Sequence, residues 1–211
     1  MGIYVGDKRY APYIGDKRRR YMGGGSSLPY DAEIEYLESN GTQYIDTGII
    51  ANNGVLIEME AAFVSGNVPI VGVNTNGNVI SVAYHTTRYV STYKGGTQKY
   101  NTVGPRYGIF FDLYFDTRGL DYIVKWNESE KYNTQTNFTI SSSDSIKLFT
   151  IDGSNISNSR VKTLRLTDSN NNVVFDAKAV RVGQTGYLYD KISGQLFGND
   201  GTGDFILGPD V

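Results

Sequence analysis

The sequence contains no cysteine, which excludes disulfide bonds and thiolate metal sites. It has a single histidine, His85, so a histidine-based zinc site and a Ser-His-Asp catalytic triad are both disfavoured. The N-terminus shows neither an apolar run nor a small-residue cleavage site, so we expect no signal peptide. No segment approaches the ~20 apolar residues that a membrane-spanning helix needs, so we expect no membrane insertion.

The residues that are abundant favour β-structure. There are 17 tyrosines, 9 phenylalanines and 25 glycines among 211 residues, a composition typical of pleated strands joined by tight turns. No stretch longer than about two turns keeps a 3.6-residue apolar period, so no long helix is expected. Turn signals divide the chain into about a dozen short strands, which is the pattern of a β-sandwich or jelly roll.

Five strand pairs are predicted around segments rich in Asn, Asp, Ser or Gly. They are 34–37 with 43–46, 68–73 with 79–84, 109–115 with 120–126, 161–166 with 173–182, and 186–189 with 195–197. Two further strands are expected at 56–64 and 146–151. The inward positions give a predicted core of Ile57, Met59, Phe63, Phe111, Leu113, Phe115, Val124, Leu148, Leu164, Leu166 and Phe175. Trp126 is expected to be buried on the same face as Tyr122 and Val124.

A basic leader with a tandem repeat precedes these strands. The hexamer Tyr-Val-Gly-Asp-Lys-Arg at Tyr4–Arg9 returns as Tyr-Ile-Gly-Asp-Lys-Arg at Tyr13–Arg18. Residues 1–25 hold six bases and two acids, a net charge of +4, whereas the remaining residues hold 14 bases and 20 acids, a net charge of −6. Because Gly23–Ser27 has the composition of a flexible linker, we predict an attachment arm over residues 1–28 and one domain over residues 29–211.

The leader is a candidate for docking on a partner protein. Each repeat unit is too short to fold alone, and it can gain order by pairing with strands of another chain or with copies of itself. The predicted docking residues are Tyr4, Val5, Lys8, Arg9, Tyr13, Ile14, Lys17, Arg18, Arg19 and Arg20. The alternatives are a disordered basic tail and an added strand on the chain's own sandwich. The acidic body disfavours a nucleic-acid partner.

Two segments resemble a known fold family. They are "YDAEIEYLESNGTQYIDTG" (30–48) and "GYLYDKISGQLFGNDGTGDFILGPDV" (186–211), which resemble the opening and closing strands of concanavalin A-like, laminin G-like domains. The segment 160–182 is similar to the late hairpin of the same domains. The resemblance implies an all-β, concanavalin A-like jelly-roll sandwich with an extended N-terminal arm. Such domains occur in phage virion proteins and in surface proteins of gut bacteria, and the leader is similar to the N-termini of phage proteins that dock on a capsid or tail.

The resemblance implies a non-enzymatic virion protein: a head fibre, a capsid decoration or a tail-fibre component, made in the host cytoplasm without a signal peptide. Its arm would bind capsid or tail proteins, and its sandwich would adhere to host-surface glycans as a homo-oligomer, with avidity compensating for weak single sites. A bacterial surface carbohydrate-binding or adhesin module is the alternative. A laminarinase-like glycoside hydrolase is the second alternative.

Candidate glycan contacts come from a tyrosine-rich polar stretch. The predicted residues are Tyr84, His85, Arg88, Tyr89 and Tyr93. Tyrosine supplies rigid contact area, and the neighbouring Ser, Thr and Asn supply adaptable hydrogen bonds. A subunit interface would need the same composition, so both interpretations stay open here.

Glu33, Glu35 and Glu38 have the spacing of the carboxylates of laminarinase-type hydrolases, with Glu35 in the place of an aspartate. Retaining chemistry needs the outer pair about 5–5.5 Å apart. The extra methylene of Glu35 and the lack of a flanking tryptophan favour a solvated strand face instead, so no catalytic residue is predicted. Loops 152–155 and 199–201 offer oxygens to calcium, but neither has the EF-hand pattern. No metal and no cofactor are therefore predicted.

Overall fold

The computed structural model describes residues 28–66, 68–75, 78–85, 89–94, 97–101, 104–119, 121–127, 129–135 and 143–211. Every regular element in these residues is a β-strand. No helix in this part of the chain is long and apolar enough to cross a membrane. The predicted arm lies almost entirely outside the described residues, because the description begins at Leu28.

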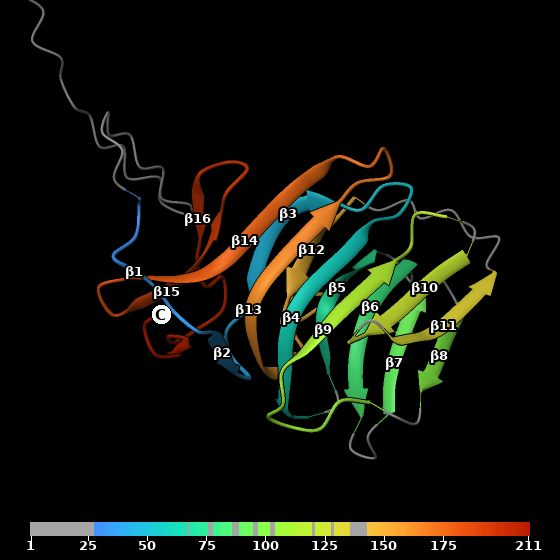
Figure 1. Cartoon of the computed structure of the whole chain (residues 1–211), viewed down its shortest axis with the longest axis horizontal. Coiled ribbons are helices and arrows are strands. Elements are labelled where there is room, and N and C mark those ends of the chain that lie inside the picture. Colours follow the sequence, from blue (N-terminus) through green and yellow to red (C-terminus); the bar gives the residue numbers. More distant parts are fainter. Residues whose placement is uncertain are drawn as a thin grey trace, which may run out of the picture.

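The strands form two antiparallel sheets that stack face to face (Figure 1). The larger sheet has 11 strands, and its main path runs β11-β10-β9-β4-β13-β14-β15-β16. Their bounds are β11 Ser129–Gln135, β10 Asp121–Trp126, β9 Phe111–Asp116, β4 Leu56–Ser65, β13 Asn158–Thr167, β14 Val173–Val182, β15 Thr185–Asp190 and β16 Gln195–Phe197. Three short strands complete the sheet: β1 Ala32–Glu33 on β14, β2 Leu37–Asn40 on β13, and β17 Ile206–Leu207 on β2.

The smaller sheet has six strands in the order β3-β12-β5-β6-β7-β8. Their bounds are β3 Ile45–Ile50, β12 Ser145–Leu148, β5 Pro69–Thr75, β6 Asn78–His85, β7 Tyr89–Lys94 and β8 Thr97–Asn101. This architecture confirms the predicted all-β sandwich of antiparallel sheets. The strand β3 lies at one edge of this sheet, and it carries the site described below.

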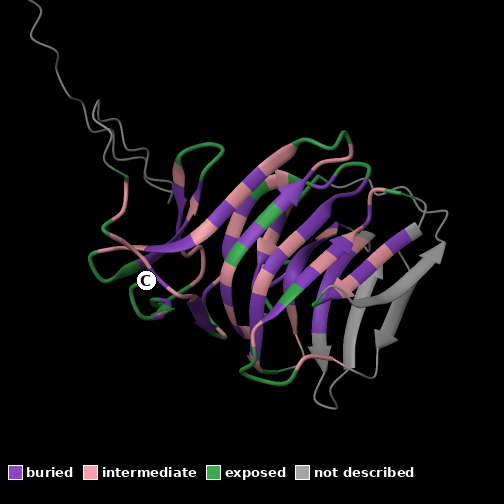
Figure 2. Ribbon diagram, in the orientation of Figure 1, coloured by how far each residue is buried: buried purple, intermediate pink, exposed green. Residues whose placement is uncertain are grey.

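The core forms because alternate residues of paired strands point to the same side. On the large sheet, Leu166 lies opposite Ile57, and Ile57 lies opposite Phe115, so the three side chains form one buried row. Burial alternates along the central strands in the same way (Figure 2). All 11 predicted core residues are buried: Ile57, Met59, Phe63, Phe111, Leu113, Phe115, Val124, Leu148, Leu164, Leu166 and Phe175. The predicted burial of Trp126 is also confirmed, with 6% of its surface exposed.

Four of the five predicted strand pairs are confirmed, and the first one is wrong. Strand β2 pairs with β13 and β17 in the large sheet, whereas β3 pairs with β12 in the small sheet. Gly41 adopts a φ of 101°, and the Gln43 side chain accepts a hydrogen bond from the backbone N–H of Asn40 at 2.9 Å. Asn40-Gly41 therefore carries the chain from one sheet to the other instead of closing a hairpin.

The predicted strand 146–151 is shorter in the structure. Strand β12 ends at Leu148, and the next residue, Phe149, has a φ of 70°, which no extended strand can contain. The Phe149 ring is fully buried, so its place in the core fixes this backbone turn.

The first and last segments of the domain are paired with each other. The backbone N–H of Glu35 donates to the carbonyl of Pro209 at 2.8 Å, and that of Val211 donates to the carbonyl of Glu33 at 3.1 Å. Strand β17 lies beside β2 in the large sheet. The two segments that carry the family resemblance therefore lie side by side.

Gly54 provides a test of this packing. A Cβ atom at Gly54 would lie 2.3 Å from the carbonyl oxygen of Thr117, and its φ is 93°. We expect Gly54→Ala to lower the free energy of unfolding by about 3 kcal/mol, because both the clash and the backbone conformation oppose the methyl group. Gly183→Ala is the matched control: its φ of 59° is also positive, but nothing lies within 4 Å of the added atom. The control should cost only about 1 kcal/mol in urea unfolding; equal losses would contradict the packing at Gly54.

Candidate functional site

The predicted glycan contacts map to neighbouring strands of the small sheet. Tyr84 and His85 end β6, and Tyr89 and Tyr93 lie on β7, where His85 is paired with Tyr89. Arg88 and the side chains of the other four lie outside the described residues, so this site stays a prediction. The ten predicted docking residues of the leader, from Tyr4 to Arg20, also lie outside them.

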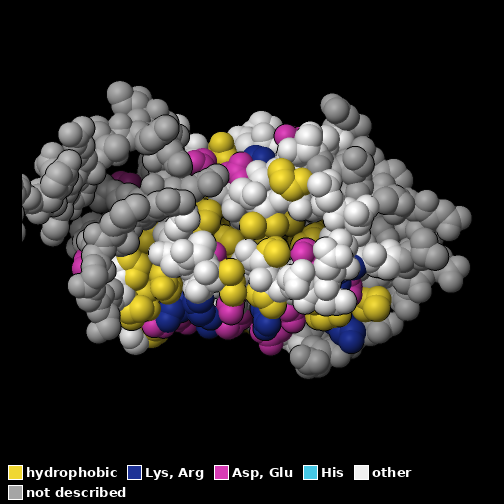
Figure 3. Space-filling model, turned by 90° about the horizontal axis from the view of Figure 1, so that it is seen from above, with side chains coloured by type: hydrophobic (Ala, Val, Ile, Leu, Met, Phe, Trp, Pro, Cys, Tyr) yellow, Lys and Arg dark blue, Asp and Glu magenta, His cyan; other side chains and the backbone are white. Residues whose placement is uncertain are grey.

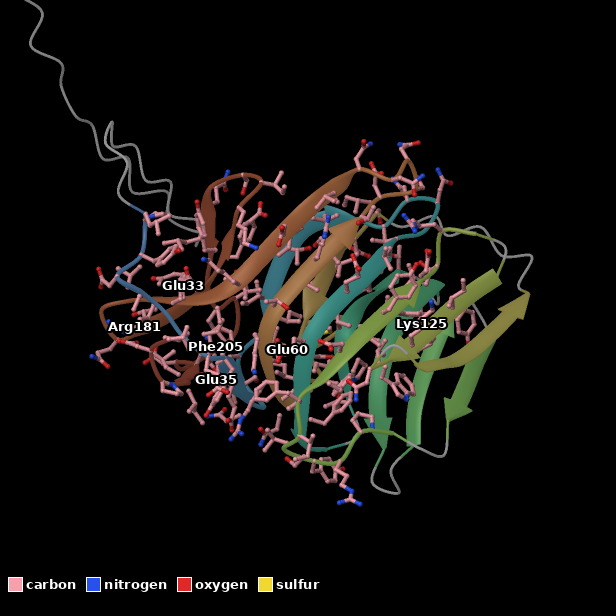
Figure 4. All side chains as sticks on the ribbon, viewed as in Figure 1. Glu33, Glu35, Glu60, Lys125, Arg181 and Phe205 are labelled. Atoms are coloured by element: carbon pink, nitrogen blue, oxygen red, sulfur yellow. The ribbon has the colours of Figure 1, made fainter. Side chains whose placement is uncertain are left out.

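Each of the three motif carboxylates lies near a different base on the large sheet, although the base near Glu35, Lys162, is closer to Glu60, at 2.8 Å. The Glu33 carboxylate contacts the Lys178 ammonium. Glu35 lies 3.7 Å from Lys162 Nζ, and Glu38 lies 2.6 Å from Arg160 Nε. The Lys178 hydrogen bond holds the pKa of Glu33 below its usual range. Figure 4 shows Glu33 apart from Glu35 and Glu60, which share Lys162.

The same bases lie over aromatic rings. Arg160 is 4.6 Å from the centre of the Tyr36 ring, and Lys162 is 4.1 Å from the centre of the Phe110 ring. Cation–π contacts of this kind add to the ion pairs. Acidic and basic side chains alternate along this margin of the molecule in Figure 3. The Glu33–Glu38 motif is thus charge-paired: Glu33 and Glu35 are partly exposed, as the predicted solvated face requires, whereas Glu38 is buried with 8% of its surface exposed.

A second group of polar residues surrounds Tyr44, immediately before the edge strand β3. Two loops that are far apart in the sequence meet there. The side chain of Asn199 accepts a hydrogen bond from the backbone N–H of Tyr44 at 3.1 Å, and the backbone N–H of Asp200 donates to the Tyr44 carbonyl at 2.8 Å. On the other side, a Cβ atom at Gly153 would lie 3.4 Å from the Tyr44 hydroxyl oxygen. The 199–201 loop therefore fixes the backbone of Tyr44, and Gly153 of the 152–155 loop lies against its ring.

The Tyr44 side chain is half-buried and packs against the main core, so its position is fixed. Burial raises the pKa of Tyr44, and the charges of Asp200 and Asp46 raise it further. The phenol therefore stays protonated at neutral pH and keeps a proton to donate. Within the described part of the chain, its hydroxyl group makes no hydrogen bond.

Asp46 is the most strongly held of the surrounding carboxylates. It accepts hydrogen bonds from the Ser145 hydroxyl and, at 2.8 Å, from the backbone N–H of Gly48. Its second oxygen lies 3.5 Å from Lys147 Nζ. Burial alone would raise the pKa of Asp46, but these hydrogen bonds and the lysine outweigh it and lower the pKa. Asp46 is thus ionised at neutral pH.

Asp200 and Asp152 are held by backbone groups. Asp200 accepts a hydrogen bond from the backbone N–H of Asp46 at 2.9 Å. Asp152 accepts from the backbone N–H and the hydroxyl of Ser154 at 2.9 and 2.8 Å, and these bonds lower its pKa against the opposing effect of burial. The oxygens suggested for calcium therefore serve the loops themselves. Among the described residues, no group of three or more His, Asp or Glu side chains could hold a metal ion.

The arrangement combines an aromatic ring, a phenol donor and carboxylate acceptors on an anchored strand. An aromatic ring can pack against the apolar face of a sugar, and carboxylates form short hydrogen bonds with hydroxyl groups. The sequence did not point to Tyr44, because its neighbours come from loops more than 100 residues away along the chain. One sign of this site is present in the sequence: the Asp-Gly turn in the 152–155 loop and the Asn-Asp-Gly turn in the 199–201 loop.

Comparisons with known proteins identify the fold. No protein-family model matches the chain, and no curated protein matches it. Among solved structures, the chain is similar to a protein of Bacteroides ovatus ATCC 8483 described as a candidate carbohydrate-binding protein, with a TM-score of 0.60 and 12% sequence identity. The match covers 83% of this chain and 60% of the Bacteroides protein, so the chain spans well under two thirds of that protein's length.

A second similar structure is the carbohydrate-binding module CBM66 of Bacillus subtilis. The match has a TM-score of 0.39 and 9% identity, and it covers 63% of this chain and 95% of the module. At such identities, the likeness to the Bacteroides protein establishes a shared all-β fold.

The low pKa of Asp46 gives a pH prediction. A carboxylate whose pKa is lower in the folded state stabilises the fold above its ordinary pKa, and this stabilisation is lost as the pH falls through the folded value. Asp46→Asn should cost about 1 kcal/mol near pH 7, because the charge-assisted hydrogen bonds are weakened. It should lose less stability than the wild type between about pH 5 and pH 2. Urea unfolding at several pH values measures both effects. Asp112→Asn, at an exposed position, is the control. If Asp46→Asn lost stability with falling pH as steeply as the wild type, the attribution of the acid sensitivity to Asp46 would be contradicted.

Proposed function

We propose that residues 29–211 form a non-catalytic carbohydrate-binding module whose contact surface is centred on Tyr44. The observation that carries the proposal is the half-buried Tyr44 ring, which lies against Gly153, has its backbone bound by Asn199 and Asp200, and feels the charges of Asp46 and Asp200. The all-β fold shared with the Bacteroides protein supports the same class of function. This corresponds to the carbohydrate-binding alternative predicted from the sequence.

The chemistry of the surface suits a sugar. Tyr44 offers a large, rigid area at a low cost in side-chain entropy. Its hydroxyl can donate to a ligand oxygen, while Asp46 and Asp200 can accept from ligand hydroxyls. Because hydrogen bonds to Asn199 and the pairing of β3 with β12 fix the backbone before binding, little order has to be created in the complex.

Substitution of Tyr44 tests the proposal. We expect Tyr44→Ala to weaken binding at least about tenfold through the lost ring contact, and Tyr44→Phe to weaken it about 2–10-fold through one lost hydrogen bond. A glycan array identifies the ligand, and titration calorimetry gives the affinities. Tyr107→Ala is the matched control, since Tyr107 is 40% exposed and lies on the loop that leads into β9.

Tyr93→Ala separates the two candidate glycan sites. If binding is lost in Tyr93→Ala and kept in Tyr44→Ala, the site lies on β6 and β7, as predicted from the sequence. If the protein binds no glycan on the array, the proposed function is wrong. An unchanged ligand after long incubation with the protein is the expected sign of a non-catalytic module.

The virion role is a second candidate, supported by the tandem repeat and the basic leader. In this version the module adheres to host glycans, and residues 1–25 attach it to a capsid or tail protein. We expect deletion of residues 1–25 to abolish incorporation into phage particles without changing the urea stability of residues 29–211. A truncated chain that still enters particles would contradict the attachment role.

A further inference from the structure

We infer that the Tyr44 surface selects sugars by charge: it binds uncharged glycan units and rejects those that carry a carboxylate or a sulfate. The inference rests on the proposed carbohydrate-binding function and adds the chemical class of the ligand. It depends on how acidic and basic groups are distributed around the ring, which is unlike their distribution elsewhere on the molecule.

Acidic groups dominate the surroundings of Tyr44. Asp200 and Asp46 act on its phenol from the same side of the chain as the 199–201 loop. Asp152 is exposed and directly precedes Gly153, which contacts the ring from the opposite loop. A ligand lying on the ring therefore meets the charges of Asp200 and Asp46, and Asp152 is next in sequence to the glycine that lies against the ring. The carboxylate of a uronic acid or a sulfate ester would be repelled by each of them.

Lys147 does not compensate for this charge. Its ammonium group lies 3.5 Å from Asp46 and donates to the carbonyl of Ser145 at 3.3 Å, and only 15% of its side chain is exposed. It neutralises Asp46 and has little surface left for a ligand. Asp200 and Asp152 remain as two negative charges, and neither forms an ion pair within the described residues.

The acidic side chains cannot rotate away from a charged ligand without breaking the loops. The Asp200 carboxylate accepts a hydrogen bond from the backbone N–H of Asp46, and the Asp152 carboxylate accepts one from the backbone N–H of Ser154. Repulsion at fixed positions is a means of specificity, because an unwanted ligand finds no relief by rearrangement. The large sheet differs, because Glu33 and Glu38 are paired with Lys178 and Arg160, and Glu35 and Glu60 share Lys162.

A matched pair of ligands tests the inference. The best neutral oligosaccharide from the array is compared with the same compound after oxidation of its primary hydroxyl groups to carboxylates. We expect the wild type to bind the neutral form at least about tenfold more tightly at low salt. The ratio should shrink at about 0.5 M salt, since these exposed charges are screened. Titration calorimetry of both ligands measures the ratio.

Two isosteric variants assign the effect to named residues. Asp200→Asn should reduce the ratio of neutral to oxidised affinity severalfold. Asp152→Asn should reduce it less, because Asp152 is not among the charges that raise the pKa of Tyr44. Asp112→Asn, on the large sheet, is the control and should leave the ratio unchanged. Thermal unfolding of each variant confirms that it is folded.

The outcomes separate this inference from the proposed function. Equal affinity for the two ligands, abolished in Tyr44→Ala, would overturn the charge selection and leave the module a carbohydrate binder at this site. A preference for the oxidised ligand would also overturn it. Binding of neither ligand, or binding that Tyr44→Ala does not change, would overturn the proposed function itself.

Discussion

The pairing of β4 with β13 is the constraint on which the rest of the structure depends. These two ten-residue strands run side by side over their whole length at the centre of the large sheet. Their inward side chains form rows with those of β9, such as Leu164, Met59 and Leu113. A one-residue slip would move every member of these rows to solvent. The register is therefore set by hydrophobic burial, and both edges of the sandwich take their positions from it.

The edge strand β3 is held by a different kind of interaction. Its first residue, Ile45, is fully buried in the core, but the strand is also anchored by side chains that bind backbone groups. Asn199 binds the N–H of Tyr44, Asp200 that of Asp46, and Thr47 donates to the carbonyl of Ile146 at 2.7 Å. Such bonds fix an edge without burying it, because they satisfy its unpaired backbone groups. A ring on such an edge is both rigid and open to a ligand.

Alternation along single strands made most of the fold predictable from sequence. The run from Leu56 to Phe63 has one apolar face, so the sequence alone predicted a strand there and which of its side chains are buried. What could not be predicted depends on contacts between distant segments. Asn40-Gly41 has the composition of a hairpin turn, yet it joins two sheets because Gln43 binds Asn40. Glu33, Glu35 and Glu38 match a catalytic spacing, and only the positions of their three bases show a paired surface. The Tyr44 site is of the same kind, since it exists only where two turns from separate parts of the chain meet.

The distribution of charge differs between the face of the large sheet and the β3 edge of the small sheet. On the large sheet, Arg165 lies opposite Glu58, and Glu58 lies opposite Tyr114, whose ring is covered by Lys125. Strand pairing brings such partners within reach, so acids and bases on a sheet face neutralise each other. At the β3 edge, the neighbouring strand β12 supplies Lys147 to Asp46. Asp200 and Asp152 are instead bound by backbone N–H groups, which satisfy hydrogen bonds but leave the charge. Among the described residues, Asp200 and Asp152 form no ion pair, and both belong to loops that contact Tyr44 at the β3 edge.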